Sequence, residues 1–184
     1  MKTEQQFYTE SPTIQDYMDN MSQLKEQSFE IYNQFEVPQD EFIKQLKAAN
    51  VHILAITEDW CGDAMLNNPI IRKTAEAADV EVRTALRDAD TDLIDRHLTN
   101  GGRAIPIYLI LNEAGEVVAK WGPRAPELQA YVTEGRNKLP AQDDPSFKEQ
   151  SEAFYTQMRK AYVEQPEFWT HVYNSFKQTL QGIL

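Results

Sequence analysis

The residues with the clearest chemical potential are the five from 60 to 64, Trp-Cys-Gly-Asp-Ala. The apolar run at 51–56 predicts a buried strand, and a helix is predicted to begin at Cys61. Its sulfur would then face the unpaired N–H groups of a first helical turn and the positive end of the helix dipole. Both favour the thiolate, which is the nucleophilic form of cysteine. The carboxylates of Asp63, Glu58 and Asp59 oppose this ionisation.

The patterns around this segment predict the elements that position it. Helical periodicity covers residues 11–35, with Ser11 and Pro12 as a plausible N-cap and first-turn pair, and a short helix follows at 42–49. Strands are predicted at 51–56, 80–86, 107–111 and 116–121, and helices at 61–78, 88–98 and 126–138. This alternation predicts an α/β fold, with a central mixed sheet and helices on both faces.

Most aromatic residues lie outside this central region, before residue 51 or after residue 139. We therefore expect an N-terminal helical extension (1–39), a central domain (40–139) and a C-terminal helical extension (140–184), packed as one globular unit. Trp169 and Tyr173 either cover Cys61 as a lid or belong to the core. The sulfur itself is expected close to Pro106 and partly open to solvent.

Composition excludes several classes of function. The chain has 184 residues and a formal charge of −11, which argues against a nucleic-acid partner and against an anionic membrane surface. The N-terminus lacks the apolar segment of a signal peptide, and no apolar window is long enough to span a bilayer. A single cysteine excludes an internal disulfide and suits the reducing cytoplasm. No oligomeric state is indicated.

Four spaced features resemble those of one known family. They are the segment Trp60-Cys61-Gly62, Pro69 eight residues after the cysteine, the pair Ile105-Pro106, and Gly122 after the predicted hairpin. Together they resemble the Trp-Cys-Gly-Pro-Cys motif, the helix-kinking proline, the cis-proline pair and the groove-lining glycine of thioredoxin-fold proteins. The resemblance implies a thioredoxin-like fold over about residues 40–138.

The departures from the family pattern concern the chemistry. Asp63 replaces the proline of the motif, Ala64 replaces the second cysteine, and Ala55 stands where thioredoxins carry a buried acid. The spacing around Cys61 is a poor match to peroxiredoxins. The resulting single-cysteine Cys-Gly-Asp-Ala motif also resembles monothiol glutaredoxins.

The first hypothesis is a monothiol thiol–disulfide oxidoreductase. Cys61 would attack a disulfide, and an external thiol would resolve the product, because the second cysteine is missing. The resemblance implies that Trp60, Gly62, Ile105, Pro106 and Gly122 contact the substrate. Asp63 is either a proton shuttle or a favourable acid in the first helical turn. The partners would be protein or low-molecular-weight thiols and disulfides, with no cofactor.

The alternative hypothesis is a redox-inactive thioredoxin-fold binding or scaffold module. Loss of both the second cysteine and the buried acid is what decay of redox function would look like. No metal site is expected, because His52, His97, His171 and Cys61 lack ligand spacing. Asp88, Asp90 and Asp92 are better explained by helix capping than by calcium binding.

Overall fold

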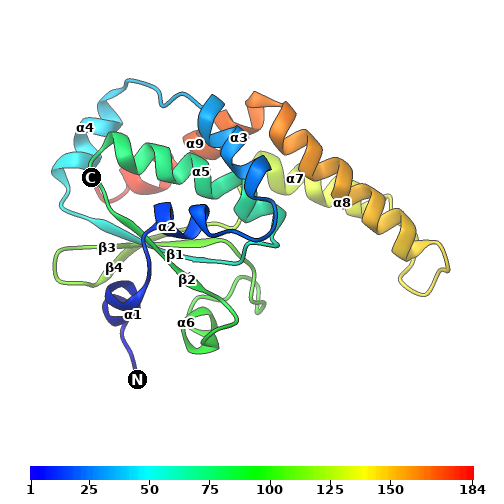
Figure 1. The fold of residues 1–184 in the computed structure, drawn as a ribbon, viewed down its shortest axis with the longest axis horizontal. Helices are drawn as coiled ribbons and strands as arrows, with labels where there is room; N and C mark the ends of the chain where they lie inside the picture. Colours follow the sequence, from blue (N-terminus) through cyan, green and yellow to red (C-terminus); the bar gives the residue numbers. More distant parts are fainter.

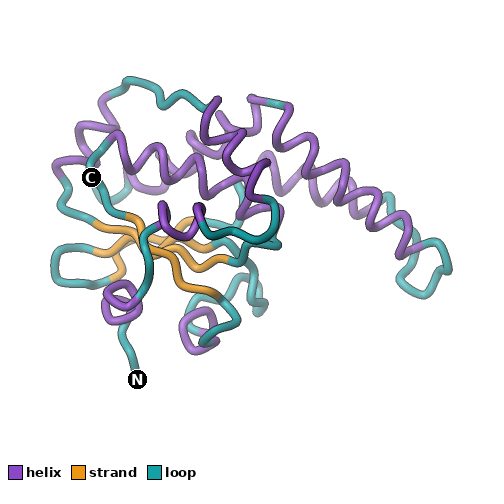
Figure 2. The backbone as a smooth tube through the Cα atoms, in the orientation of Figure 1, coloured by secondary structure: helices purple, strands orange, loops and turns teal.

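A four-stranded mixed sheet forms the centre of the protein, seen in a computed structural model that describes residues 1–184. The strands are β1 (His52–Thr57), β2 (Val82–Leu86), β3 (Ile107–Leu111) and β4 (Val117–Trp121), in the order β2-β1-β3-β4. β1 runs parallel to β2 and antiparallel to β3, and β4 is antiparallel to β3. Figure 2 shows these strands enclosed by helices. The predicted mixed α/β sheet is confirmed.

Helices cover both faces of the sheet (Figure 1). One face carries α1 (Glu4–Glu10) and α6 (Thr91–Asp95). The other carries α2 (Ile14–Asp19), α3 (Lys25–Gln34), α4 (Glu41–Ala48), α5 (Gly62–Ala77), α7 (Pro126–Asn137), α8 (Phe147–Glu164) and α9 (Pro166–Gln181). β1 is apolar without alternation because it contributes to both layers: Ile53 packs in one core cluster and Leu54 in the other.

The aromatic residues of the two flanks are part of the larger core. Phe35 and Phe42, from the N-terminal part of the chain, both pack against Tyr173 of α9. Trp169 is buried in the same cluster, and its indole N–H donates to the carbonyl oxygen of Tyr162 at 2.7 Å. Trp169 and Tyr173 are therefore core residues and do not form a lid over Cys61.

The N-terminal region differs from the prediction of one helical segment over 11–35. In the structure, α1 precedes residue 11, and the range 11–35 contains two helices, α2 and α3. They are separated by a loop in which Leu24 adopts a left-handed conformation. Ser11 and Pro12 do not begin α2, whose N-cap is Thr13. The physical reason is pairing with the sheet: Thr13 bridges Arg83, and the carbonyl of Pro12 accepts from the N–H of Thr84.

The other elements follow the prediction closely, with one exception. α6 ends at Asp95 instead of reaching 98, because the chain turns there and Thr99 forms a tight bridge with Gly102. The predicted capping is confirmed for Asp90, whose carboxylate accepts from the N–H of Asp92 at the start of α6, whereas the Asp88 carboxylate pairs with Arg87 instead. None of the helices has both the length and the apolar character needed to cross a membrane.

Candidate functional site around Cys61

Cys61 is the N-cap of α5, at the end of the loop that follows β1. Its sulfur accepts a hydrogen bond from the N–H of Ala64 at 3.5 Å, as the predicted position at the helix start requires. On its other side, the thiol donates to the carbonyl oxygen of Ile105 at 3.6 Å. The Ile105–Pro106 peptide bond is cis. The structure thus brings together the cysteine and the Ile105-Pro106 pair.

The sulfur is much less accessible than expected. Cys61 is only 9% exposed, so the expectation of a partly open thiol is wrong. Burial, together with the negative charge of Asp63, raises the pKa of Cys61 to about 11. The N–H groups of Ala64 and Asp63 and the cation of Arg124 act in the opposite direction, but they do not outweigh burial. At neutral pH the resting cysteine is therefore a protonated thiol.

Asp63 is held in a buried ion pair beside the sulfur. One carboxylate oxygen contacts Nη2 of Arg124 at 2.7 Å, and the other accepts from the hydroxyl of Tyr162 at 2.9 Å. Burial acts to lower the pKa of Arg124, but the charge and the hydrogen bond of Asp63, together with Tyr162 and Cys61, leave the pKa above its ordinary value. Both Asp63 oxygens are occupied, which makes this residue a poor proton shuttle for Cys61.

The C-terminal helix α8 covers the first turn of α5. An added Cβ at Gly62 would lie 3.1 Å from Cγ of Arg159 and 3.5 Å from the methyl carbon of Met158. One turn further along α8, Tyr162 is fully buried and bonds Asp63. The helix that the sequence assigns to an extension therefore forms one wall of the site.

A neutral polar network lies behind the cysteine, in the part of the core where Ala55 supplies no acid. The amide of Asn68 donates to Oγ1 of Thr57 at 3.1 Å, and its oxygen accepts from the hydroxyl of Tyr108 at 2.5 Å. The hydroxyl of Tyr17 lies 3.3 Å from the same Thr57 oxygen. Burial raises the pKa of Tyr108 well above its ordinary value, so this network carries no charge at neutral pH.

Trp60 is exposed to solvent, whereas Gly122 packs against the cis-proline segment. Trp60 is 45% exposed, and the guanidinium of Arg87 stacks over its ring at 5.0 Å. Gly122 has a φ of +122°, and an added Cβ there would lie 2.3 Å from the carbonyl oxygen of Pro106. Only glycine can occupy that position, because a side chain would be strained and would collide with the backbone of the cis-proline segment.

Comparison with known proteins identifies the family. A family model described as thioredoxin matches residues 11–138, which is more than half of the chain. The chain belongs to the thioredoxin family. The match begins before the predicted domain boundary at residue 40 and includes α2 and α3. No curated protein matches the chain.

Two solved structures share the fold of this thioredoxin-family chain. A protein of unknown function from Pseudomonas aeruginosa is 15% identical, with a TM-score of 0.67 and complete coverage of both chains. An HIV epitope-scaffold protein is 14% identical, also with a TM-score of 0.67, and the alignment covers 98% of this chain and 99% of that one. At these identities the likeness concerns the fold alone.

Within this thioredoxin-family fold, sequence reasoning missed two residues of the site. Arg124 follows Gly122 and Pro123, whose peptide bond is also cis, and this turn directs its side chain to Asp63. An arginine two residues after the predicted groove glycine was a usable signal. For Tyr162 the sequence offered no signal beyond its position on the aromatic face of a distant helix. The chain contains no group of three or more His, Cys, Asp or Glu side chains arranged to hold a metal ion.

Proposed function

We propose that this thioredoxin-family protein carries out thiol–disulfide exchange with Cys61 as its single reacting cysteine. One observation carries the proposal: the sulfur lies at the first turn of α5 and beside the carbonyl of Ile105, which precedes the cis-proline. At this position a thiolate would be stabilised by helix N–H groups, and a disulfide-bearing chain could lie along the backbone of Ile105 and Pro106.

The reaction has two balanced steps. The Cys61 thiolate attacks one sulfur of a substrate disulfide, forms a mixed disulfide and releases the other sulfur as a thiolate. An external thiolate then attacks the substrate sulfur of the mixed disulfide, which regenerates the Cys61 thiolate and leaves a new disulfide between substrate and external thiol. Ala64 cannot perform this second step. The external thiol would be a protein or a low-molecular-weight thiol of a reducing compartment, which we take to be the cytoplasm.

The other site residues have supporting roles in this proposal. Ile105 and Pro106 would present backbone to the substrate, and Gly122 lets the segment pack closely behind them. Trp60 and Gly62 would flank the entry to the sulfur. Asp63 is assigned as a positioning residue, because both of its oxygens are occupied by Arg124 and Tyr162.

A redox-inactive binding module remains the second candidate, and one observation favours it. Cys61 is buried, with a pKa of about 11, so almost no thiolate exists at neutral pH. Relative to a free cysteine with a pKa of roughly 8.5, the thiolate fraction at pH 7 is lower by roughly 300-fold. Exchange therefore requires that the disulfide substrate itself, whether a protein or a small disulfide such as oxidised glutathione, uncover or ionise the sulfur when it binds.

Trapping of a mixed disulfide separates the two candidates. The folded protein is incubated at pH 8 with 5,5′-dithiobis(2-nitrobenzoate) or with oxidised glutathione, and the mass is measured with Cys61→Ser as the control. A mixed disulfide on the folded protein that reduced glutathione then releases is the expected result. If only the urea-unfolded chain reacts, the exchange proposal is wrong and the binding module stands.

The pH dependence of alkylation tests the state of the thiol. The rate of reaction with iodoacetamide should rise with pH and reach its midpoint near pH 11 in the folded protein. The unfolded chain should show its midpoint near roughly pH 8.5. A folded-state midpoint below pH 8 would contradict the account of burial given above, while strengthening the case for catalysis.

A further inference from the structure

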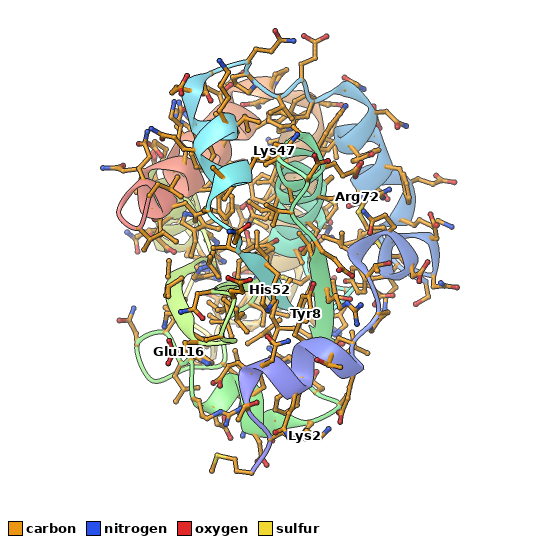
Figure 3. The ribbon with its side chains drawn as sticks, turned by 90° about the vertical axis from the view of Figure 1, so that its left-hand side faces the viewer. Lys2, Tyr8, Lys47, His52, Arg72 and Glu116 are labelled. Atoms are coloured by element: carbon orange, nitrogen blue, oxygen red, sulfur yellow. The ribbon has the colours of Figure 1, made fainter.

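A groove of about 670 Å³ lies on the opposite side of β2 from β1, between α1, α2 and the loops that follow β1 and β2. It contains neither Cys61 nor the Ile105-Pro106 pair. Part of its lining is apolar and comes from Phe7, Tyr17, Met21 and Leu86. Figure 3 shows α1 crossing the end of the sheet, with Lys2 at the start of the chain and Tyr8 beside His52.

The groove has an excess of negative charge. Its charged side chains are Glu10, Asp16, Glu58, Asp59, Asp90 and Lys2. Lys2 pairs with Glu10, and none of the other four carboxylates forms an ion pair. Glu58 accepts a hydrogen bond from the backbone N–H of Asp88, and Asp59 accepts from the N–H and the hydroxyl of Ser22. These donors are neutral, so the charges of the two carboxylates are not compensated. A ligand of positive charge is therefore favoured.

The outer backbone edge of β2 is open at its end, at Leu86, beside the same groove. The N–H of Ile53 donates to the carbonyl of Glu81, and the N–H of Arg87 donates to the carbonyl of Thr57. The backbone N–H and C=O groups of the odd-numbered residues of β2 therefore point toward β1. Thr84 and Leu86 consequently point their backbone groups outward. The N–H of Thr84 is used by Pro12, but the short bridging segment ends there and does not reach Leu86.

A buried side chain also lacks a partner at this edge. Thr84 is 2% exposed and lines the groove, and its hydroxyl oxygen has no hydrogen-bond partner. A buried hydroxyl without a partner is costly, and a ligand backbone in the groove could supply one. This observation is independent of the acidic charge.

We propose that this groove binds an extended peptide segment of a partner protein that is rich in lysine and arginine. The segment continues the sheet by pairing with the backbone of Leu86, beyond the end of the Pro12–Thr13 bridge, as in strand addition, and it offers a partner to the Thr84 hydroxyl. Its basic side chains lie among the unpaired carboxylates, and the apolar residues of the groove contact its aliphatic stems. This surface is separate from Cys61 and does not depend on exchange chemistry.

Fluorescence anisotropy with three labelled octapeptides tests the proposal. The first peptide has the sequence Lys-Thr-Lys-Val-Arg-Val-Lys-Thr, the second replaces each basic residue by glutamate, and the third is the basic peptide N-methylated at alternate amides. We expect the basic peptide to bind, the acidic peptide not to bind, and N-methylation to weaken binding by roughly tenfold or more, because it removes the donors needed for strand pairing. Binding should weaken with added salt.

Variants locate the binding site. Asp16→Asn/Asp90→Asn should weaken binding by roughly tenfold, and asparagine keeps the helix cap at residue 90. The matched control Asp143→Asn/Glu149→Gln changes two exposed acids near the outer end of α8 and should bind as the wild type does. Cys61→Ser should also bind normally, whatever the outcome of the exchange experiments.

Amide hydrogen exchange adds a direct readout, because the Leu86 N–H should become protected when the basic peptide is bound. Absence of binding, equal binding of the N-methylated peptide, or an unchanged affinity of the Asp16/Asp90 variant would each overturn the proposal. An unprotected Leu86 amide in the bound state would overturn it as well.

Discussion

Tyr162→Phe tests whether the hydrogen bond between Tyr162 and Asp63 stabilises the packing of α8 on the first turn of α5. The hydroxyl of Tyr162 donates to Asp63 at 2.9 Å, and the side chain is fully buried. Hydrogen bonds to charged groups contribute roughly 1.5–3 kcal/mol. Phenylalanine keeps the ring, so the change removes the bond without opening a large cavity. Asp63 keeps its contact with Arg124, so we expect a loss of about 2 kcal/mol in the free energy of unfolding.

Urea denaturation followed by far-UV circular dichroism measures this loss, with two other tyrosines of the C-terminal helices as controls. The hydroxyl of Tyr155 accepts from Arg136 at an exposed position, and Tyr155→Phe should cost less than about 0.5 kcal/mol. Tyr173 donates to the partly exposed Asp40, so its phenylalanine variant should fall between the other two. The m-value should not change in any of them.

A double-mutant cycle adds the decisive comparison. Tyr162→Phe and Asp63→Asn should be non-additive by about 1 kcal/mol or more, because both changes remove the same interaction. If Tyr162→Phe costs no more stability than Tyr155→Phe, or if the effects of Tyr162→Phe and Asp63→Asn simply add, the hydrogen bond does not stabilise the packing of α8 on α5. The account of α8 as a wall of the site would then be refuted.

Two further predictions concern pH and glycine. Between about pH 9 and 11, the free energy of unfolding of the wild type should fall by about 2–3 kcal/mol relative to that of Cys61→Ala. The reason is that the thiol of the unfolded chain loses its proton first, while burial keeps the pKa of the folded thiol near 11. Parallel pH profiles of unfolding free energy for the two proteins would contradict this. Gly122→Ala should lower the free energy of unfolding by about 3 kcal/mol or more, because the backbone there is left-handed and the Pro106 carbonyl blocks a Cβ. Gly62→Ala should lower it by about 1 kcal/mol or less, because the added Cβ meets only the flexible Arg159 side chain. Equal melting temperatures for the two glycine variants would show that the Pro106 contact is unimportant.

Local sequence patterns were sufficient for most of the elements and for the position of the cysteine. The apolar run at 51–56 and the helix signals after it place Cys61 at the start of α5, because strand burial and helix capping depend on neighbouring residues. The division of 11–35 into α2 and α3 could not be predicted in this way. It depends on the pairing of Thr13 with β2 and on the bonds from Ser22 to Asp59, which join residues far apart in the chain.

The amino-acid sequence by itself determined the presence of one cysteine, the absence of a resolving partner two or three residues later, and the acidic balance of the chain. Only the tertiary structure decided the state of that cysteine. Burial depends on which distant segments pack around the sulfur. Ile105 contacts the sulfur from 44 residues away, and α8 brings Arg159 and Tyr162 to the neighbouring Gly62 and Asp63 from about a hundred residues away. The helix dipole acts locally and favours the thiolate, but desolvation by the folded chain is the larger effect and keeps the thiol protonated.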